Sequence, residues 1–177
     1  MGGAASMSGN LTLKPAVFRI VGHSGSGKTT VVEKLIRELS GRGLRIATIK
    51  HTHHTVVLDT VGKDSYRFKE AGAVMSMLVS PNELQMVAEA PECREPEQLA
   101  KQFMGEADVV LAEGFTSGSS AKIEVLRRDC GKPPRCAVAD GLIAIVTDND
   151  EIYPQLPHFG LEDIAEIADF ILEQSAN

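Results

Sequence analysis

The sequence predicts an α/β fold in which a largely parallel sheet is flanked by helices. Short apolar runs of strand length alternate with amphipathic segments of helical spacing from residue 16 to residue 172. A glycine-serine turn at 22–27 joins the first apolar run directly to the first helical segment. The chain has 177 residues, 43% of them hydrophobic, which is enough for one domain with a sizeable core. Strands that alternate with helices favour parallel pairing.

The first part of the chain is predicted to form a strand, a helix and a second strand. Residues 16–21 (AVFRIV) form a short apolar run, and residues 28–40 form an amphipathic helix that Gly41 ends. Residues 44–49 (LRIATI) alternate as a strand that leads to Lys50. The apolar face of the helix consists of Val31, Val32, Leu35, Ile36 and Leu39.

A polar loop separates these elements from the middle of the chain. Residues 65–71 are predicted to form a helix that ends at Gly72. Two strands follow at 73–79 and 83–88, around the turn pair Pro81-Asn82. The later elements are a helix that a proline opens, three strands and a closing helix, at 96–104, 108–112, 121–126, 142–146 and 161–172.

Residues 22–29 (GHSGSGKT) match the phosphate-loop pattern G-x-x-x-x-G-K-[ST] at every fixed position. Glycines let successive N–H groups face one phosphate, and the helix that follows adds its positive end. Lys28 is expected to reach the β and γ phosphates, Thr29 to ligate Mg²⁺ and Thr30 to donate to the α phosphate. The strand before the loop and the helix after it favour a P-loop NTPase-like fold over a chance match. The predicted nucleotide-binding residues here are Gly22, Ser24, Gly25, Ser26, Gly27, Lys28, Thr29 and Thr30.

Glu113 ends the apolar run DVVLAEG and is the predicted catalytic and metal-site carboxylate. P-loop proteins need such a group near Mg²⁺, which prefers oxygen ligands and keeps several waters. We expect Glu113 to hold the metal through water or to orient the attacking water; the alternative is an exposed acid at a strand end. Gly114 and the glycine-serine stretch 117–120 predict a mobile segment.

Three histidines, His51, His53 and His54, follow the second strand. A polar loop that lines the nucleotide or substrate cleft is the favoured interpretation, and metal binding is the second, because no HExxH or cysteine pair accompanies them. Asp59 is a further candidate ligand of Mg²⁺, although mixed charges in such a segment usually form a solvated face.

Asp148 follows the last predicted strand and is a candidate for recognition of the base. Its carboxylate can accept hydrogen bonds from guanine N1 and N2, which adenine lacks. The usual N-K-x-D guanine motif is missing, and residues 148–150 equally fit a turn.

Composition excludes several classes of protein. The net charge is −6 and no run of Lys or Arg stands out, so no nucleic-acid partner is expected. No apolar stretch reaches the roughly 18 residues of a membrane span, and the three cysteines lack a C-x-x-C spacing, which favours a reduced cytoplasm. Residues 1–14 read as a flexible lead before a single nucleotide-binding domain at 15–177.

Five segments occur in an order that resembles the MobB family, the molybdopterin-guanine dinucleotide biosynthesis adapter proteins. They are VGHSGSGKTT, GLRIATIKHTHH, GKDSYR followed by AGA, DVVLAEGF and KIEVLR, and the resemblance covers residues 17 to about 128. It implies a GTP-binding, homodimeric P-loop protein that assists the guanylyltransferase joining GMP to molybdopterin, with at most slow GTP hydrolysis. It also implies the phosphate-loop roles and the role of Glu113. The segment VVLDT departs from the family by having Asp59 without a second carboxylate, which weakens a metal role there.

Three hypotheses follow from the sequence. The first is the GTP-binding adapter, in which hydrolysis is slow because no arginine finger is evident. The second is a small-molecule kinase with Asp59 or Asp64 as base, although Arg127, Arg128 and Arg135 fit no recognised lid pattern. The third is a metal-delivery GTPase that uses the histidines.

Overall fold

The computed structural model describes residues 15–90, 95–149 and 152–176, which form two compact units. The larger unit contains the described residues up to His51 and from Glu95 onward, and the smaller one begins at Thr52. The predicted flexible lead at 1–14 lies outside the described residues, and the single nucleotide-binding domain at 15–177 stays a prediction.

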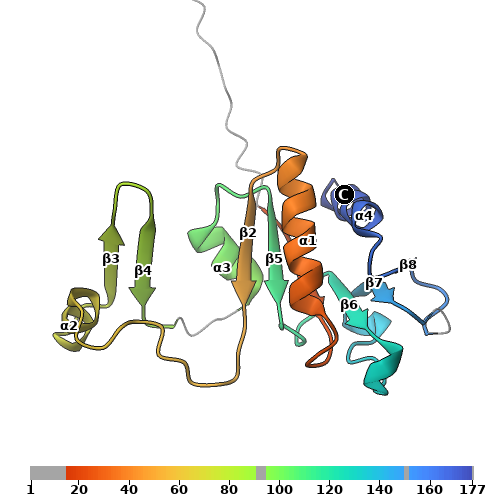
Figure 1. Ribbon diagram of the computed structural model, residues 1–177, viewed down its shortest axis with the longest axis horizontal. Helices are drawn as coiled ribbons and strands as arrows, with labels where there is room; N and C mark the ends of the chain where they lie inside the picture. The colour runs from red at the N-terminus through yellow and green to blue at the C-terminus, as the bar shows by residue number, and fades with distance from the viewer. Residues whose placement is uncertain (1–14, 91–94, 150–151, 177) are drawn as a thin grey trace, which may run out of the picture. The chain divides into compact units, whose positions relative to one another are not determined.

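A six-stranded parallel sheet forms the centre of the larger unit (Figure 1). The strand order is β2-β5-β1-β6-β7-β8, so the first strand lies between two strands that come much later in the chain. The strands are β1 Ala16–Val21, β2 Ile46–Lys50, β5 Val109–Glu113, β6 Lys122–Leu126, β7 Leu142–Thr147 and β8 His158–Phe159. The prediction of a largely parallel sheet is confirmed; the two-residue β8 was not predicted.

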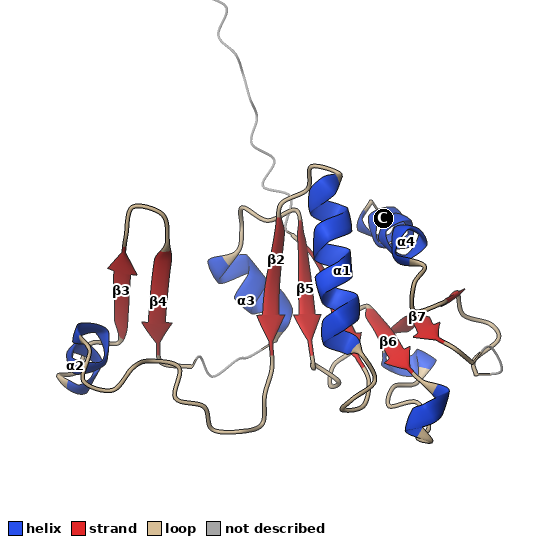
Figure 2. Cartoon of the chain, in the orientation of Figure 1, coloured by secondary structure: helices blue, strands red, loops and turns tan. Residues whose placement is uncertain are grey.

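Helices cover both faces of this sheet (Figure 2). On one face, α1 (Lys28–Gly41) and α4 (Ile164–Ser175) enclose the main core with residues such as Ile20 and Leu35, both fully buried. Successive residues of a strand point to opposite faces, so Arg19 faces the other side, where α3 (Pro96–Phe103) lies. Short 3₁₀ turns at Arg128–Cys130 and Val138–Asp140 precede β7. Among the described residues, no helix is long and apolar enough to cross a membrane.

The smaller unit consists of a short helix and a hairpin. Helix α2 spans Asp64–Glu70, and strands β3 (Met75–Val79) and β4 (Leu84–Ala88) pair antiparallel. The Ser80 amide donates to Glu83 O over 2.9 Å, which closes the predicted turn at Pro81-Asn82. The strands therefore start one or two residues later than predicted, and their existence and pairing are as expected.

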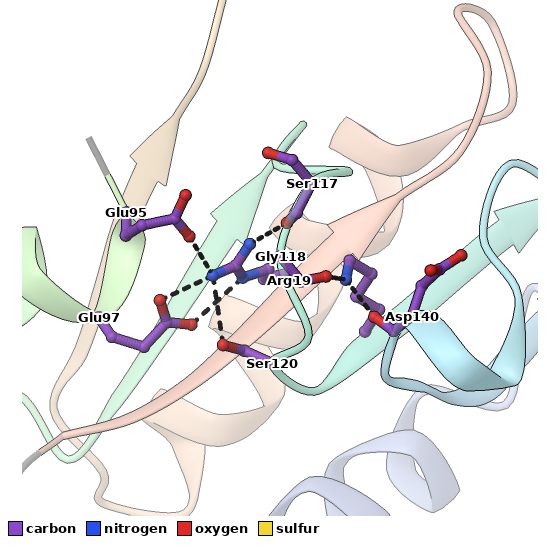
Figure 3. Close-up of polar contacts among 8 residues, drawn as sticks. Arg19, Glu95, Glu97, Ser117, Gly118, Ser120 and Asp140 are labelled. Carbon is purple, nitrogen blue, oxygen red and sulfur yellow. Dashed lines mark hydrogen bonds and ion pairs between the residues drawn. The ribbon is translucent and has the colours of Figure 1, made fainter. Parts of the chain in front are cut away.

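Residues 114–121 carry the chain from β5 to β6 without a helix. Strands β5 and β6 lie on either side of β1 and run parallel to it. This segment must therefore bring the chain from the carboxyl ends of the strands back to their amino ends. Carbonyl groups of a segment laid against a sheet need donors. Arg19, only 1% exposed, donates to Ser117 O and, over 3.2 Å, to Ser120 Oγ (Figure 3). The fully buried Lys122 donates to Gly118 O and Asp140 O.

The same guanidinium ties the start of α3 to this crossover. Arg19 binds the Glu97 carboxylate through Nε (3.2 Å) and Nη2 (2.7 Å), and Glu95 through Nη2 (2.6 Å). Burial disfavours the charge of Arg19, but the hydrogen bonds to Glu97 and Glu95 outweigh it and raise the pKa of Arg19. The mobile segment predicted at 117–120 is therefore held in place in the structure.

Replacing Arg19 with Met should destabilise the protein strongly, because the carbonyl of Ser117 and the two glutamates lose their donor. We expect a loss of about 2–3 kcal/mol, or a decrease in the melting temperature of roughly 5–10 °C. Calorimetry of Arg19→Met beside Arg45→Met, which breaks an exposed pair with Asp108, measures the effect. Equal melting temperatures of the two variants would contradict the role given to Arg19.

Glu97 should make stability depend on pH. Burial raises its pKa, but the hydrogen bond from Arg19, together with bonds from its own backbone amide and Ser120 and the charge of Arg19, holds the pKa below the ordinary 4.5. A lowered folded-state pKa contributes stability that is present above 4.5 and is lost as the pH falls through the lowered value. In urea titrations, the difference between the native protein and Glu97→Gln should be largest near neutral pH and shrink on acidification. Glu106→Gln, at an exposed pair, is the control, and a pH-independent difference for Glu97→Gln would refute the assignment.

Candidate functional site

The loop at residues 22–27 connects β1 to α1 at the carboxyl edge of the sheet, where ligands of such folds bind. Gly22 has φ 140°, and a Cβ there would collide with the carbonyl oxygen of Val125 on β6. Gly27 has φ 93° and is the residue from which α1 begins. The first N–H groups of a helix have no partner within it, so this loop presents donors to an anion.

Lys28 lies across the loop. Its Nζ donates to His23 O over 2.7 Å. Burial lowers the pKa of Lys28, Arg135 and Lys50 lower it further through their positive charges, and Glu113 opposes them. The ammonium group thus stands where positive charge is concentrated and a bound anion would favour its charged form.

Glu113 and Thr29 meet at the end of β5. The Thr29 hydroxyl donates to Glu113 Oε2 over 3.0 Å, and Lys50 Nζ lies 3.3 Å from Glu113 Oε1. The Glu113 side chain is 13% exposed. A hydroxyl and a carboxylate side by side form an oxygen-only donor set, which suits Mg²⁺ with retained waters. The structure therefore brings together two of the three predicted metal ligands.

The other predicted residues of the loop differ in orientation. Ser26 is fully buried, its amide donates to His23 O over 3.2 Å, and its Oγ has no partner among the described residues. Ser24, Gly25 and Thr30 are exposed. The nucleotide roles of these residues stay predictions.

Asp148 follows β7 and bonds to the segment after β6. Its Oδ1 accepts a hydrogen bond of 2.7 Å from the amide of Arg128, at the start of a 3₁₀ turn, and the Asn149 amide donates to Thr147 Oγ1 over 3.0 Å. The alternative turn at 148–150 includes Asp150, which lies outside the described residues, and it stays a prediction. Recognition of a guanine base by Asp148 stays a prediction.

The histidine loop starts against Glu113. The His51 amide donates to Glu113 O over 2.9 Å, and its ring packs on Phe115 with 5.1 Å between the ring centroids. Within the described part of the chain, no three His, Cys, Asp or Glu side chains group closely enough to hold a metal ion.

Asp59 belongs to the smaller unit, so its place beside Thr29 stays a prediction. Its Oδ1 accepts from the Thr60 amide (2.8 Å) and Ser65 Oγ (2.9 Å), while Oδ2 is buried without a partner among the described residues. Asp59 lines an open cleft of about 450 Å³, together with residues that include Lys63 and Phe68.

Sequence reasoning missed the segment that follows β6. Glu124 on β6 is fully buried, and its carboxylate accepts from the amides of Arg135 (2.7 Å) and Cys136 (3.1 Å). His23 Nε2 lies 2.8 Å from Pro133 O, which links the same segment to the phosphate loop. The acidic residue inside the apolar run KIEVL was the available signal, since a carboxylate in a buried strand needs donors.

Comparison with known proteins agrees with this architecture. A family model described as molybdopterin guanine dinucleotide synthesis protein B matches residues 17–148. The molybdopterin-guanine dinucleotide biosynthesis adapter protein of Haemophilus influenzae is 39% identical over 153 residues, 86% of this chain and 85% of that protein. The protein of the same name from Escherichia coli is 35% identical over 156 residues, 85% of this chain and 87% of that protein.

Solved structures show the same fold. A crystal structure of molybdopterin-guanine biosynthesis protein B (mobB) has a TM-score of 0.71 at 27% identity, covering 91% of this chain and 99% of that one. Bacillus subtilis MobB has a TM-score of 0.69 at 26% identity, covering 90% of this chain and 97% of that one. The predicted P-loop NTPase-like fold and the family resemblance are confirmed. This chain belongs to the molybdopterin guanine dinucleotide synthesis protein B family, MobB.

Proposed function

We propose that this protein is a GTP-binding accessory protein that assists the attachment of GMP to molybdopterin. The observation that carries the proposal is the phosphate loop with Lys28 across it and the Thr29–Glu113 pair at its side. Membership in a family whose Haemophilus influenzae and Escherichia coli members are named biosynthesis adapter proteins supplies the biological setting. Its site in the cell is the cytoplasm.

The chain's own residues divide the work on a Mg²⁺-bound nucleotide. The loop amides and Lys28 would bind the phosphates, the Thr29 hydroxyl would bind the metal directly, and Glu113 would hold it through water. The metal supplies neutralisation of phosphate charge. Lys50, 3.3 Å from Glu113, keeps that carboxylate oriented. Hydrolysis is at most slow, and the nucleotide serves chiefly as a bound ligand.

The hairpin of the smaller unit supports a homodimer. Alternate residues of paired strands share one face, and here every residue of that face is apolar. Met77 is 52% exposed, Val79 69% and Leu84 59%, although a two-stranded hairpin is only marginally stable without a covering layer. The whole face consists of Met75, Met77, Val79, Leu84, Met86 and Ala88. We propose that this apolar hairpin face binds a second copy of the chain. The nucleotide edge, which is the edge of the sheet that carries the phosphate loop and Glu113, would bind the guanylyltransferase and its molybdopterin.

Calorimetric titration with Mg²⁺-GTP and, separately, Mg²⁺-ATP tests the site. The native protein should bind GTP more tightly than ATP, and Lys28→Ala should abolish triphosphate binding, because the phosphate charge loses its main side-chain partner. Lys34→Ala, which removes another positive charge of the same helix, one that pairs with Glu162, is the matched control and should bind normally.

The possible outcomes separate the hypotheses. A preference for ATP would favour the kinase and remove the reason to assign a base-recognition role to Asp148. Unchanged GTP affinity in Lys28→Ala would place the nucleotide elsewhere.

The dimer is tested by placing charge on the apolar hairpin face. The native protein should have about twice the 19.0 kDa mass of one chain in light scattering after gel filtration. The double variant Met77→Lys, Leu84→Lys should shift it to the mass of one chain, because burying two ammonium groups is costly. Gln85→Lys, on the opposite face of the same hairpin, should remain dimeric. A native protein with the mass of one chain at micromolar concentration contradicts the assignment.

A further inference from the structure

The segment that follows β6 lies beside the phosphate loop. The β6 carbonyl at Val125 is in contact range of Gly22, so β6 ends next to the start of the loop. Beyond β6, two sets of hydrogen bonds hold the chain. Pro133 O accepts a hydrogen bond from His23 Nε2 over 2.8 Å, and the amides of Arg135 and Cys136 donate to the buried Glu124. These anchors come from two different elements, so the backbone at Arg135 has a defined position against the nucleotide edge.

The side chain of Arg135 is exposed, although its backbone is anchored. Within the described part of the chain, its guanidinium makes no hydrogen bond or ion pair. Two residues earlier, Pro133 O lies 2.8 Å from His23 Nε2 of the phosphate loop, so Arg135 projects from a segment that borders this loop. In agreement, the charges of Arg135 and Lys50 lower the pKa of Lys28. Lys28 is thus acted on by two further cations, Arg135 and Lys50, and Lys50 Nζ lies 3.3 Å from Glu113 Oε1.

Arg135 and Lys50 repel the ammonium group of Lys28, and Glu113 is the carboxylate that acts most strongly in the opposite sense. A phosphate chain on the loop would supply the missing negative charge. Arg is suited to this role, since its planar fork donates two parallel hydrogen bonds to a phosphate. Arg127, Arg128 and Lys132 belong to the same segment but are not among the charges that act most strongly on Lys28.

We propose that Arg135 contacts the terminal phosphates of the bound nucleotide, as a cation supplied in cis by the segment after β6. The proposal rests on the proposed GTP-binding function and adds a contact that the phosphate-loop pattern does not contain. Because Lys28 reaches the β and γ phosphates, Arg135 beside it acts on the same end of the nucleotide. A triphosphate gains more from this contact than a diphosphate.

The test compares Arg135→Ala with the matched control Lys132→Ala in calorimetric titrations with Mg²⁺-GTP and Mg²⁺-GDP. Arg135→Ala should weaken GTP binding about tenfold or more, and GDP binding less, because a hydrogen bond to a charged group is lost. Lys132→Ala should stay within about twofold of the native protein, since it removes an exposed charge that is not among those acting most strongly on Lys28. Arg135→Lys should recover part of the affinity, because it keeps the charge without the fork.

Melting temperatures guard against a purely structural effect. Arg135→Ala should have the same melting temperature as the native protein, because the Arg135 side chain is exposed and only its backbone is anchored. If the native protein binds GTP and Arg135→Ala matches Lys132→Ala, the phosphate contact is refuted while the GTP-binding function stands. If the native protein binds neither nucleotide, both proposals fall.

Discussion

The larger unit depends on a buried guanidinium. Arg19 lies in β1, inside the sheet, and supplies donors to a crossover segment that has no helix. The chain passes from β5 to β6 in eight residues, 114–121, and Arg19 and Lys122 donate to its carbonyl groups at Ser117 and Gly118. The desolvation cost of burying these two cations is offset because Glu95 and Glu97 pair with Arg19, and two carbonyl groups accept hydrogen bonds from Lys122.

This arrangement connects the fold to the site. Glu113 lies at the end of β5, directly before the crossover. Phe115, the second residue of the crossover, packs on His51. Because Arg19 and Lys122 hold the crossover, the Glu113 carboxylate that precedes it stays beside Thr29. On the other side of β1, the buried Glu124 plays the matching part by fixing the segment that carries Arg135. Arg19 on β1 and Glu124 on β6, both buried, therefore position the segments on the two sides of the phosphate loop.

The smaller unit has a different physical character. Its hairpin has one wholly apolar and largely exposed face, and its helix α2 has no buried residue. A unit of this kind gains stability by being covered, which agrees with an accessory protein that acts through assembly. The strongest polar feature of the unit is Asp59, whose carboxylate is held by Thr60 and Ser65 at the edge of the cleft.

The sequence by itself determined the elements, the phosphate loop and Glu113 at the end of its strand. These features depend on local signals: apolar periodicity, glycines where φ is positive, and a carboxylate directly after an apolar run. Element ends moved by a few residues, as at β2, because hydrogen bonding with neighbouring strands decides where a strand stops. Only the tertiary structure decided that Arg19 binds Glu97, 78 residues away, that Arg135 stands near Lys28, and that the 117–120 segment is fastened. The physical reason is that such contacts depend on strand order and on which face of a strand each side chain occupies, and neither is encoded in the local pattern of residues.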